Sequence, residues 1–590
     1  MLHVSLFVES LRSRPHLTVW VIALMQGLLW TLVPAIFYSS PPGQLPETIA
    51  IGHEFQLATY LGPPLAYWLA EIAYHLGRFG VYLLAQACVV VTYWAVFALG
   101  CAIVGARHAA FAVVLMGGIY AFTVPSPEFG PGILAMALWA LALLHFWRAA
   151  EEGRFGYWIA LGVDLGLLLL TSYASFIFLG LLLVYLLITE RGRAQFTDIG
   201  PWIAGVIIVV LTFPQLIWLD HPRGAAIVPP AMNLQVNPIA GLRMLGWLVT
   251  AHVGLLILVL LAVGLPAKKR TELATVERAP VDSDGKYFVY FFALAPAAAM
   301  FVFAVLVGGT APILVSPLPV LSGLAVMAAA PDSLRLVHQR LAGFAWTILV
   351  VLPPLLVIAA VTALPWVYRY ELDFGQPAGE MGRYFSESFQ RRTGKPLTIV
   401  AGDERTAALV ALAAPSRPSL YLDATPERTP WVSRQDIEAK GAVVVWPISD
   451  NSGAPPPEIK ARFPDLVPDV PRAFARSVQG RLPLTRIGWG VIRPRGAAPE
   501  VPTQAQPPLV QPQLKPQVQP QMQPQVQPQV QPKVQQPSQP LAQPKLEPPL
   551  PPPQQQQTPS RQQQQQQQQR RQQQQYQQQQ QKFRDPATQW

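Results

Sequence analysis

The side chains best suited to chemistry in this 590-residue sequence are carboxylates that lie between long apolar segments. Glu47 and Glu54 belong to the stretch between the first two segments, and Glu128 lies in the stretch after the third. An ionised carboxylate takes a proton from a hydroxyl group, so each of the three could serve as a general base. Structural explanations also exist, because Glu47 could cap a helix and Glu54 could pair with His53. Glu128 lies among prolines and glycines, where a solvated turn explains it equally well.

Aromatic and cationic side chains near these carboxylates are the candidate substrate-binding residues. The first stretch, residues 39–79, carries two helical patterns with apolar faces, separated by Pro63 and Pro64. Helices of this kind lie along a membrane surface, where they could roof a cavity or anchor the interface through aromatic rings. Arginine suits phosphate because its guanidinium donates paired hydrogen bonds, although a lone loop arginine is usually solvated. The candidates are His53, Tyr67, Trp68, His221 and Arg223.

The composition indicates which elements position these residues. Hydrophobic residues make up 51% of the chain and charged residues 13%, which is too little charge to cover several soluble domains. Eleven apolar segments are long enough, or nearly so, to cross a membrane. The first is too long for a removable signal peptide and is expected to be an anchor. The approximate ranges are 16–38, 80–104, 108–124, 132–149, 156–171, 173–189, 201–219, 242–265, 287–308, 312–330 and 342–366.

Charges in the loops predict the orientation of these segments. Arginine and lysine gather in alternate loops, for example at Arg12 and Arg14 and again at Arg191 and Arg193. Loops rich in Lys and Arg stay in the cytoplasm, so the N-terminus is expected there and everything after residue 366 outside, in the periplasm. The net charge of +10 therefore reflects membrane orientation and a basic tail, and no nucleic-acid partner is expected.

The region after the last apolar segment, residues 367–496, is predicted to form a small α/β domain, because strand and helix patterns alternate there. It contains no Gly-rich phosphate loop and no cluster with the spacing of metal ligands. The expected strands are 397–401, 419–423, 442–446 and 487–492, and the expected helices are 404–413 and about 434–440.

The end of the chain consists of Pro/Gln repeats followed by nearly pure glutamine. It lacks the apolar residues that would offset the entropy of ordering, so it is expected to be disordered, with polyproline II character in the Pro/Gln part. The sequence therefore predicts three parts. They are a polytopic helical membrane domain at 1–366, the periplasmic α/β domain at 367–496 and the disordered tail at 497–590.

The order of these features resembles a known family. An acidic outer loop follows the first spanning helix and contains Gly52-His-Glu-Phe-Gln56 and Gly62-Pro-Pro-Leu-Ala-Tyr-Trp-Leu69. The terminal α/β region contains Ala401-Gly-Asp403, Pro418-Ser-Leu-Tyr-Leu-Asp423 and Gly441-Ala-Val-Val-Val-Trp446. Over roughly residues 10–495 the chain is similar to the bacterial membrane glycosyltransferases of the protein mannosyltransferase and aminoarabinose transferase type. These have the GT-C fold and belong to families 39 and 83.

The resemblance implies that a sugar passes from a polyprenyl-phosphate donor to a glycan, lipid or protein acceptor at the outer face of the bacterial inner membrane. It also implies a carboxylate base, with cationic help or a divalent metal ion for the departing phosphate. Family members carry an acidic residue, usually Asp, early in the first outer loop and a second acid shortly after it. Here Gln44 occupies the first position and Glu47 the second. Glutamine cannot take a proton at neutral pH, so the base is Glu47, Glu54 or Glu128, or the protein does not catalyse transfer.

Three classes of function remain open at this point. The first is an inner-membrane glycosyltransferase. The second is a non-catalytic relative that binds lipid or takes part in envelope assembly, with the Gln-rich tail as its interaction arm. The third and weakest is a transporter. Transporters often have internal repeats and helices interrupted at matching positions, and neither feature is evident in this sequence. Carboxylates that converge at a cavity at membrane level would favour the enzyme, and scattered carboxylates would favour the non-catalytic relative.

Overall fold

The computed structural model describes residues 9–220, 236–263, 275–307, 317–335, 339–368, 370, 372–422, 428–448, 453–464 and 466–495. All of them lie within one compact unit, Met1–Gln504. His221, Arg223 and the predicted tail at 497–590 lie outside the described residues.

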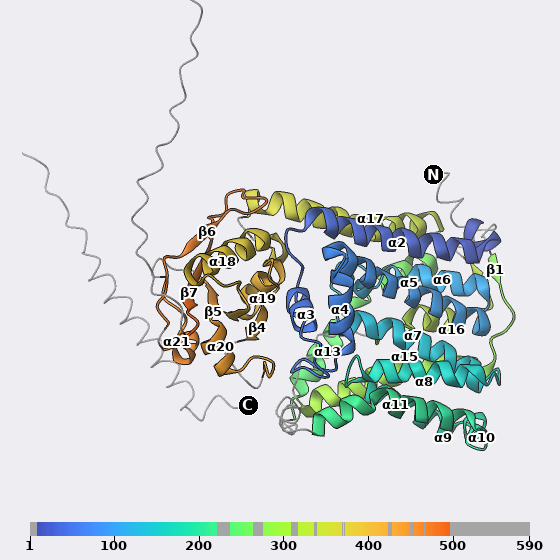
Figure 1. Ribbon diagram of the computed structural model, residues 1–590. Coiled ribbons are helices and arrows are strands. Elements are labelled where there is room, and N and C mark those ends of the chain that lie inside the picture. Colours follow the sequence, from blue (N-terminus) through green and yellow to red (C-terminus); the bar gives the residue numbers. More distant parts are fainter. Residues whose placement is uncertain are drawn as a thin grey trace, which may run out of the picture. The chain divides into compact units, whose positions relative to one another are not determined.

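Each of the eleven predicted apolar segments contains a helix (Figure 1), which confirms a polytopic helical membrane protein. Among the described helices, α2, α5, α7, α11, α15 and α17 are each long and apolar enough to cross a membrane. The other helices are shorter, and α13 and α14 are long enough only when they are taken together as one bent pair. The helices are α2 (Pro15–Phe37), α5 (Gly77–Ile103), α6 (Ala106–Met116), α7 (Pro131–Ala150), α8 (Gly156–Leu169), α9 (Ser175–Ile188), α11 (Gly200–Asp220), α13 (Pro238–Ala251), α14 (Val253–Val263), α15 (Ser283–Val307), α16 (Ser322–Ala329) and α17 (Gln339–Val367).

The helices pack in chain order, α2 against α5, α5 against α7, α7 against α8 and α8 against α11. Small residues permit this close approach, as at Gly162, where an added Cβ would lie 2.9 Å from the backbone of Ala204. Aromatic side chains fill the wider gaps, and Trp139 stacks on Phe178 with ring centroids 3.8 Å apart. Close backbone contact between small residues is a usual way to pack membrane helices, because lipid gives no hydrophobic drive to associate.

The predicted single segment at 242–265 consists of two helices, α13 and α14, bent by 50° between Ala251 and Val253. The imidazole of His252 lies 2.6 Å from the Leu248 carbonyl oxygen through Nδ1 and 2.8 Å from the Ser322 hydroxyl through Nε2. A side chain that binds the preceding turn competes with the helical hydrogen bonds and bends a helix. The apolar pattern alone could not reveal this break.

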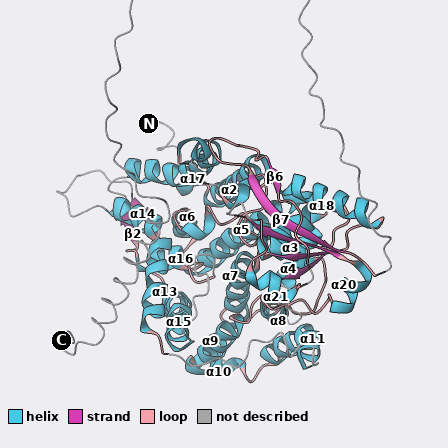
Figure 2. Ribbon diagram, turned by 90° about the vertical axis from the view of Figure 1, so that its left-hand side faces the viewer, coloured by secondary structure: helices cyan, strands magenta, loops and turns pink. Residues whose placement is uncertain are grey.

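The α/β region contains a five-stranded sheet in the order β4-β3-β5-β7-β6. Figure 2 shows its strands in magenta, with β6 and β7 labelled. β4, β3 and β5 are parallel, whereas β7 is antiparallel to both β5 and β6. Helices α18 and α19 cover one face, and α20 and α21 cover the other. All predicted strands and both predicted helices are present, and α18, α21 and β6 are additional. The bounds are β3 (Ile399–Gly402), β4 (Ser419–Leu422), β5 (Ala442–Pro447), β6 (Arg472–Phe474), β7 (Thr485–Ile492), α18 (Ala378–Thr393), α19 (Glu404–Ala413), α20 (Arg434–Lys440) and α21 (Pro457–Arg462).

The long loop after α2 contains the two predicted helices, α3 (Leu45–Gly52) and α4 (Leu65–Tyr74), which pack against each other. α3 also packs against α19. Ile51 and Tyr67 belong to the same apolar cluster as Phe385 and Val443 of the α/β region. The loop is therefore held in place by the sheet domain, and the acidic side chains that it carries have fixed surroundings.

Candidate active site

Glu47 is buried in the first turn of α3, with 6% of its surface exposed. Its carboxylate accepts a hydrogen bond from its own backbone N–H, which fits the helix-cap explanation. Its Oε2, however, has no partner among the described residues. Burial raises the pKa of Glu47 to about 7, against the opposing effects of that hydrogen bond and of the nearby Arg405 charge. A carboxyl group with this pKa can both take and release a proton near neutral pH.

Glu128 meets the start of the first loop from the turn that precedes α7. Its Oε1 accepts a hydrogen bond of 2.7 Å from the backbone N–H of Gln44. Desolvation raises the pKa of Glu128, and the Gln44 hydrogen bond and the Arg405 charge oppose this rise. The negative charge of Glu128 in turn contributes to the raised pKa of Glu47. The structure thus brings Glu47 and Glu128 into one electrostatically coupled site.

Arg405 of α19 supplies the positive charge at this pair of carboxylates. Its guanidinium donates to backbone carbonyl oxygens of the first loop, at Gly43 and, over 3.3 Å, at Pro41. It also donates to the carbonyl oxygen of Asp373 over 2.7 Å, while its buried Nε has no partner among the described residues. Arg405 could not be singled out from the sequence, because its partners are backbone atoms far away in the chain, which leave no local pattern. We call Glu47, Glu128 and Arg405 the carboxylate–arginine cluster.

An apolar cavity of about 570 Å³ lies next to this cluster. Its walls come from the turn after α6, from the break between α13 and α14, from α17 and from the segment that follows α17. Tyr120 lines it, and the charge of Glu128 helps to raise the Tyr120 pKa. Phe374 also lines it and follows Asp373, which receives the Arg405 hydrogen bond. The cavity therefore offers room for a long apolar group, and Tyr120 and Phe374 connect it to the cluster, although none of the three cluster residues lines it.

Glu54 belongs to a second group of charges. Its pKa is raised by burial and lowered by a hydrogen bond from Ser419 and by the charges of His53 and Arg417. His53 pairs with Glu71, at 2.9 Å between Nδ1 and Oε1, and not with Glu54 as the ion-pair explanation supposed. Arg417 binds the other carboxylate oxygen of Glu71. This group joins the first loop to the α/β region, which is what a structural ion-pair network does.

The aromatic candidates make contacts of their own within the described chain. Tyr67 is buried, with its hydroxyl near the Thr59 side chain. Trp68 donates from Nε1 to the carbonyl oxygen of Gln56 over 3.0 Å. Both residues fix the shape of the first loop, and a binding role for them and for His53 stays a prediction.

The metal requirement implied by the resemblance has no matching donor set in the part of the chain that the structure describes. No group of three or more His, Cys, Asp or Glu side chains there has the arrangement of a metal site. The positive charge beside Glu47 and Glu128 comes from Arg405. Arginine can stabilise a departing phosphate by charge and hydrogen bonds without a metal ion.

Replacing Gly43 by Ala is expected to reduce activity by about tenfold or more, because it displaces Glu128. Gly43 has φ +50°, and an added Cβ would lie 2.1 Å from the Glu128 carboxylate. The measurement is the transfer rate of the purified full chain relative to wild type. Gly130→Ala is the matched control, since a Cβ at Gly130 meets nothing within 4 Å. Equal rates for Gly43→Ala and wild type would show that the position of Glu128 does not matter.

The helical bundle, the helical first loop and the terminal α/β region define a polytopic membrane protein with the GT-C fold. Residues 62–218 match the family model "Dolichyl-phosphate-mannose-protein mannosyltransferase". The resemblance inferred from the sequence is thereby confirmed. No curated protein matches the chain by sequence.

Two solved structures of ArnT from Cupriavidus metallidurans share the fold. The one bound to undecaprenyl phosphate has a TM-score of 0.53 at 13% identity, with 81% of this chain and 99% of that chain covered. The apo state has a TM-score of 0.51 at 14% identity with the same coverage. The Archaeoglobus fulgidus oligosaccharyltransferase in the apo form aligns with a TM-score of 0.40 at 14% identity, covering 73% of this chain and 69% of that chain.

Proposed function

We propose that this protein is an inner-membrane glycosyltransferase that moves a sugar from a polyprenyl-phosphate donor to a lipid, glycan or protein acceptor on the periplasmic face. The observation that carries the proposal is the carboxylate–arginine cluster beside the apolar cavity. The mannosyltransferase family segment and the ArnT structure with bound undecaprenyl phosphate support the donor class. The alternating loop charges support the orientation.

In this mechanism Glu47 is the general base. Its carboxylate takes the proton of the acceptor hydroxyl while the acceptor oxygen bonds to the anomeric carbon of the sugar. The bond between that carbon and the phosphate oxygen breaks, and its electron pair leaves with the lipid phosphate. Arg405 stabilises the negative charge on the leaving phosphate, because cationic donors placed where charge develops lower the barrier. Glu128 fixes the backbone at Gln44, immediately before the helix that carries Glu47.

The apolar cavity provides the place for the lipid chain of the donor. Val253 and Gly254 at the bend and Leu352 and Leu356 of α17 line it, so its walls are suited to isoprenoid groups. A polyprenyl chain held there would direct its phosphate toward the polar end near Tyr120. Burial of the apolar chain then positions the sugar without specific contacts along the lipid.

The envelope glycans of a deletion strain test this function. A glycan, glycolipid or glycoprotein should lose one sugar in the deletion strain and regain it when the wild-type gene is restored. Mass spectrometry of total envelope fractions identifies both the sugar and the acceptor. Unchanged glycans in the deletion strain would favour the non-catalytic relative, for which the replacement of the family Asp by Gln44 is the supporting observation.

The pH dependence of transfer should reflect the pKa of Glu47, which is about 7. The base is active when ionised, so kcat/KM should rise by about tenfold per pH unit below this pKa and become constant above it. The rate of the purified chain in proteoliposomes, followed with a radiolabelled donor across the pH range, checks this expectation. A profile that turns near pH 4.5, the ordinary value for Glu, would show that the base is a solvent-exposed carboxylate.

A further inference from the structure

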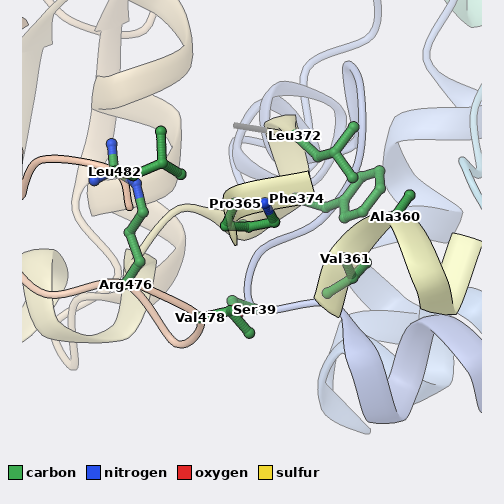
Figure 3. Close-up of a pocket in the computed structure, with 10 residues that line it drawn as sticks. Ser39, Ala360, Val361, Pro365, Leu372, Phe374, Arg476, Val478 and Leu482 are labelled. Carbon is green, nitrogen blue, oxygen red and sulfur yellow. The ribbon is translucent and has the colours of Figure 1, made fainter. Parts of the chain in front are cut away.

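A second cavity, of about 580 Å³, is lined by three arginines and one glutamate. It lies where the ends of α2 and α17 meet the start of α5, the start of α18 and the segment between β6 and β7. A narrow space of about 30 Å³ shares lining residues with both this cavity and the apolar cavity. Figure 3 shows the residues that line this space. Neither Glu47 nor Glu128 lines the second cavity, so it is distinct from the candidate active site.

The arginines give this cavity an excess of positive charge. Arg78 donates from Nη1 to the Tyr38 carbonyl oxygen over 2.7 Å, which holds its guanidinium at the cavity wall. Arg476 donates to the Pro483 carbonyl oxygen. Arg383, on the first half of α18, is exposed and makes no hydrogen bond or ion pair with any described residue. Guanidinium groups on different elements that line one cavity match the several oxygens of a phosphate.

Part of the remaining cavity wall is apolar and comes from α2 and α17, two helices long enough to cross a membrane. Ile36 at the end of α2 is 69% exposed, and Val361 of α17 lies in the same lining. The C-terminal ends of both helices line the cavity, and the rest of each helix is apolar and long enough to span a membrane. A ligand that fits must therefore be charged at one end and apolar at the other.

We propose that this cavity binds the phosphate headgroup of a membrane lipid, with the acyl chains along α2 and α17. The lipid is distinct from the polyprenyl donor, because Tyr38 and Phe374 separate the two cavities. Their rings are stacked with centroids 4.0 Å apart, and the Ser39 and Ser40 N–H groups donate to the Phe374 carbonyl oxygen. The proposal holds whether or not the carboxylate–arginine cluster transfers a sugar.

Binding of short-chain lipids to the full chain in a non-ionic detergent tests this site. Dioctanoyl phosphatidic acid should bind saturably, dioctanoylglycerol without phosphate should not, and inorganic phosphate should compete only at far higher concentration. Arg383→Gln should weaken phosphatidic acid binding by about tenfold, the loss expected for one charge-assisted contact. Arg391→Gln is the matched control, because Arg391 lies on the same helix but does not line the cavity.

Three outcomes would overturn the proposal. Equal binding of the two lipids would show that phosphate is not recognised. Equal affinity for inorganic phosphate would assign the cavity to a soluble anion. Equal losses in Arg383→Gln and Arg391→Gln would show that only the overall charge attracts the lipid. Arg78→Gln gives a second test from another element, and thermal unfolding in detergent identifies any variant that loses binding because it misfolds.

Discussion

Replacing Glu47 by Gln is expected to reduce sugar transfer by about 10²- to 10⁴-fold, the usual contribution of a general base. Glutamine keeps the size of the side chain but cannot take a proton. The measurement is initial rate with purified protein, together with the envelope glycan profile of a complemented deletion strain. Glu54→Gln is the matched control, because Glu54 is a half-buried glutamate of the same loop but belongs to the group around Glu71.

The stability of Glu47→Gln distinguishes loss of a base from loss of the fold. The folded protein raises the Glu47 pKa from 4.5 to about 7, so this carboxyl group costs the folded state stability as the pH rises from 4.5 to 7, and the full loss is reached above pH 7. Glu47→Gln should therefore unfold at the same or a higher temperature than wild type at about pH 8, with the difference disappearing below the ordinary Glu pKa. Full activity in Glu47→Gln, with activity lost in Glu54→Gln, would assign the base to Glu54 instead.

Replacing Glu71 by Gln is expected to destabilise the protein by about 3 kcal/mol, because it leaves Arg417 without its carboxylate partner. Glu71 is 6% exposed and binds both Arg417 and His53. The change should lower the unfolding midpoint in detergent by several degrees and speed proteolysis in the first loop. The readout is thermal unfolding followed by intrinsic fluorescence, with limited trypsin digestion in parallel.

Glu152→Gln is the matched control for Glu71→Gln. Glu152 also pairs with an arginine, Arg154, but this pair is solvent-accessible, with the Arg154 side chain 62% and the Glu152 side chain 32% exposed. Exposed pairs of this kind contribute about 0–1 kcal/mol, so the midpoint should not change measurably. Equal midpoints for Glu71→Gln and wild type would mean that apolar packing alone holds the loop on the α/β region.

The helices and the sheet could be predicted because their signals are local. Apolar length defines a spanning helix, and alternating short patterns define the strands of the α/β region. Helix α18 was missed although Met381, Phe385 and Phe389 lie at helical spacing, a pattern the sequence does contain. The bend at His252 could not be predicted, because the apolar pattern continues through it and the second partner of the His252 ring, Ser322, lies on another helix.

The carboxylate–arginine cluster could be predicted only in part, because only some of its residues have a local signal in the sequence. Glu47 and Glu128 could be identified as candidates because acidic residues are rare in an apolar chain. Each of them also lies in a loop between two apolar segments. Their association depends on Gly43, whose positive φ and missing Cβ make room for the Glu128 carboxylate. Arg405 could not be distinguished by sequence from the other arginines of the α/β region. Only tertiary structure shows which of them reaches the first loop.

The hydrogen bond from Arg405 to Gly43 spans 362 residues of chain and has a consequence for biosynthesis. Translation at about 5–20 residues per second separates the two ends of this bond by roughly 20–70 seconds. For most of that interval the nascent chain already contains Glu47 and Glu128 but not the cation that lies beside them. The cluster is completed only after the last spanning helix has been inserted and the sheet domain has folded, so a prematurely terminated chain would hold its lipid cavity without a finished site.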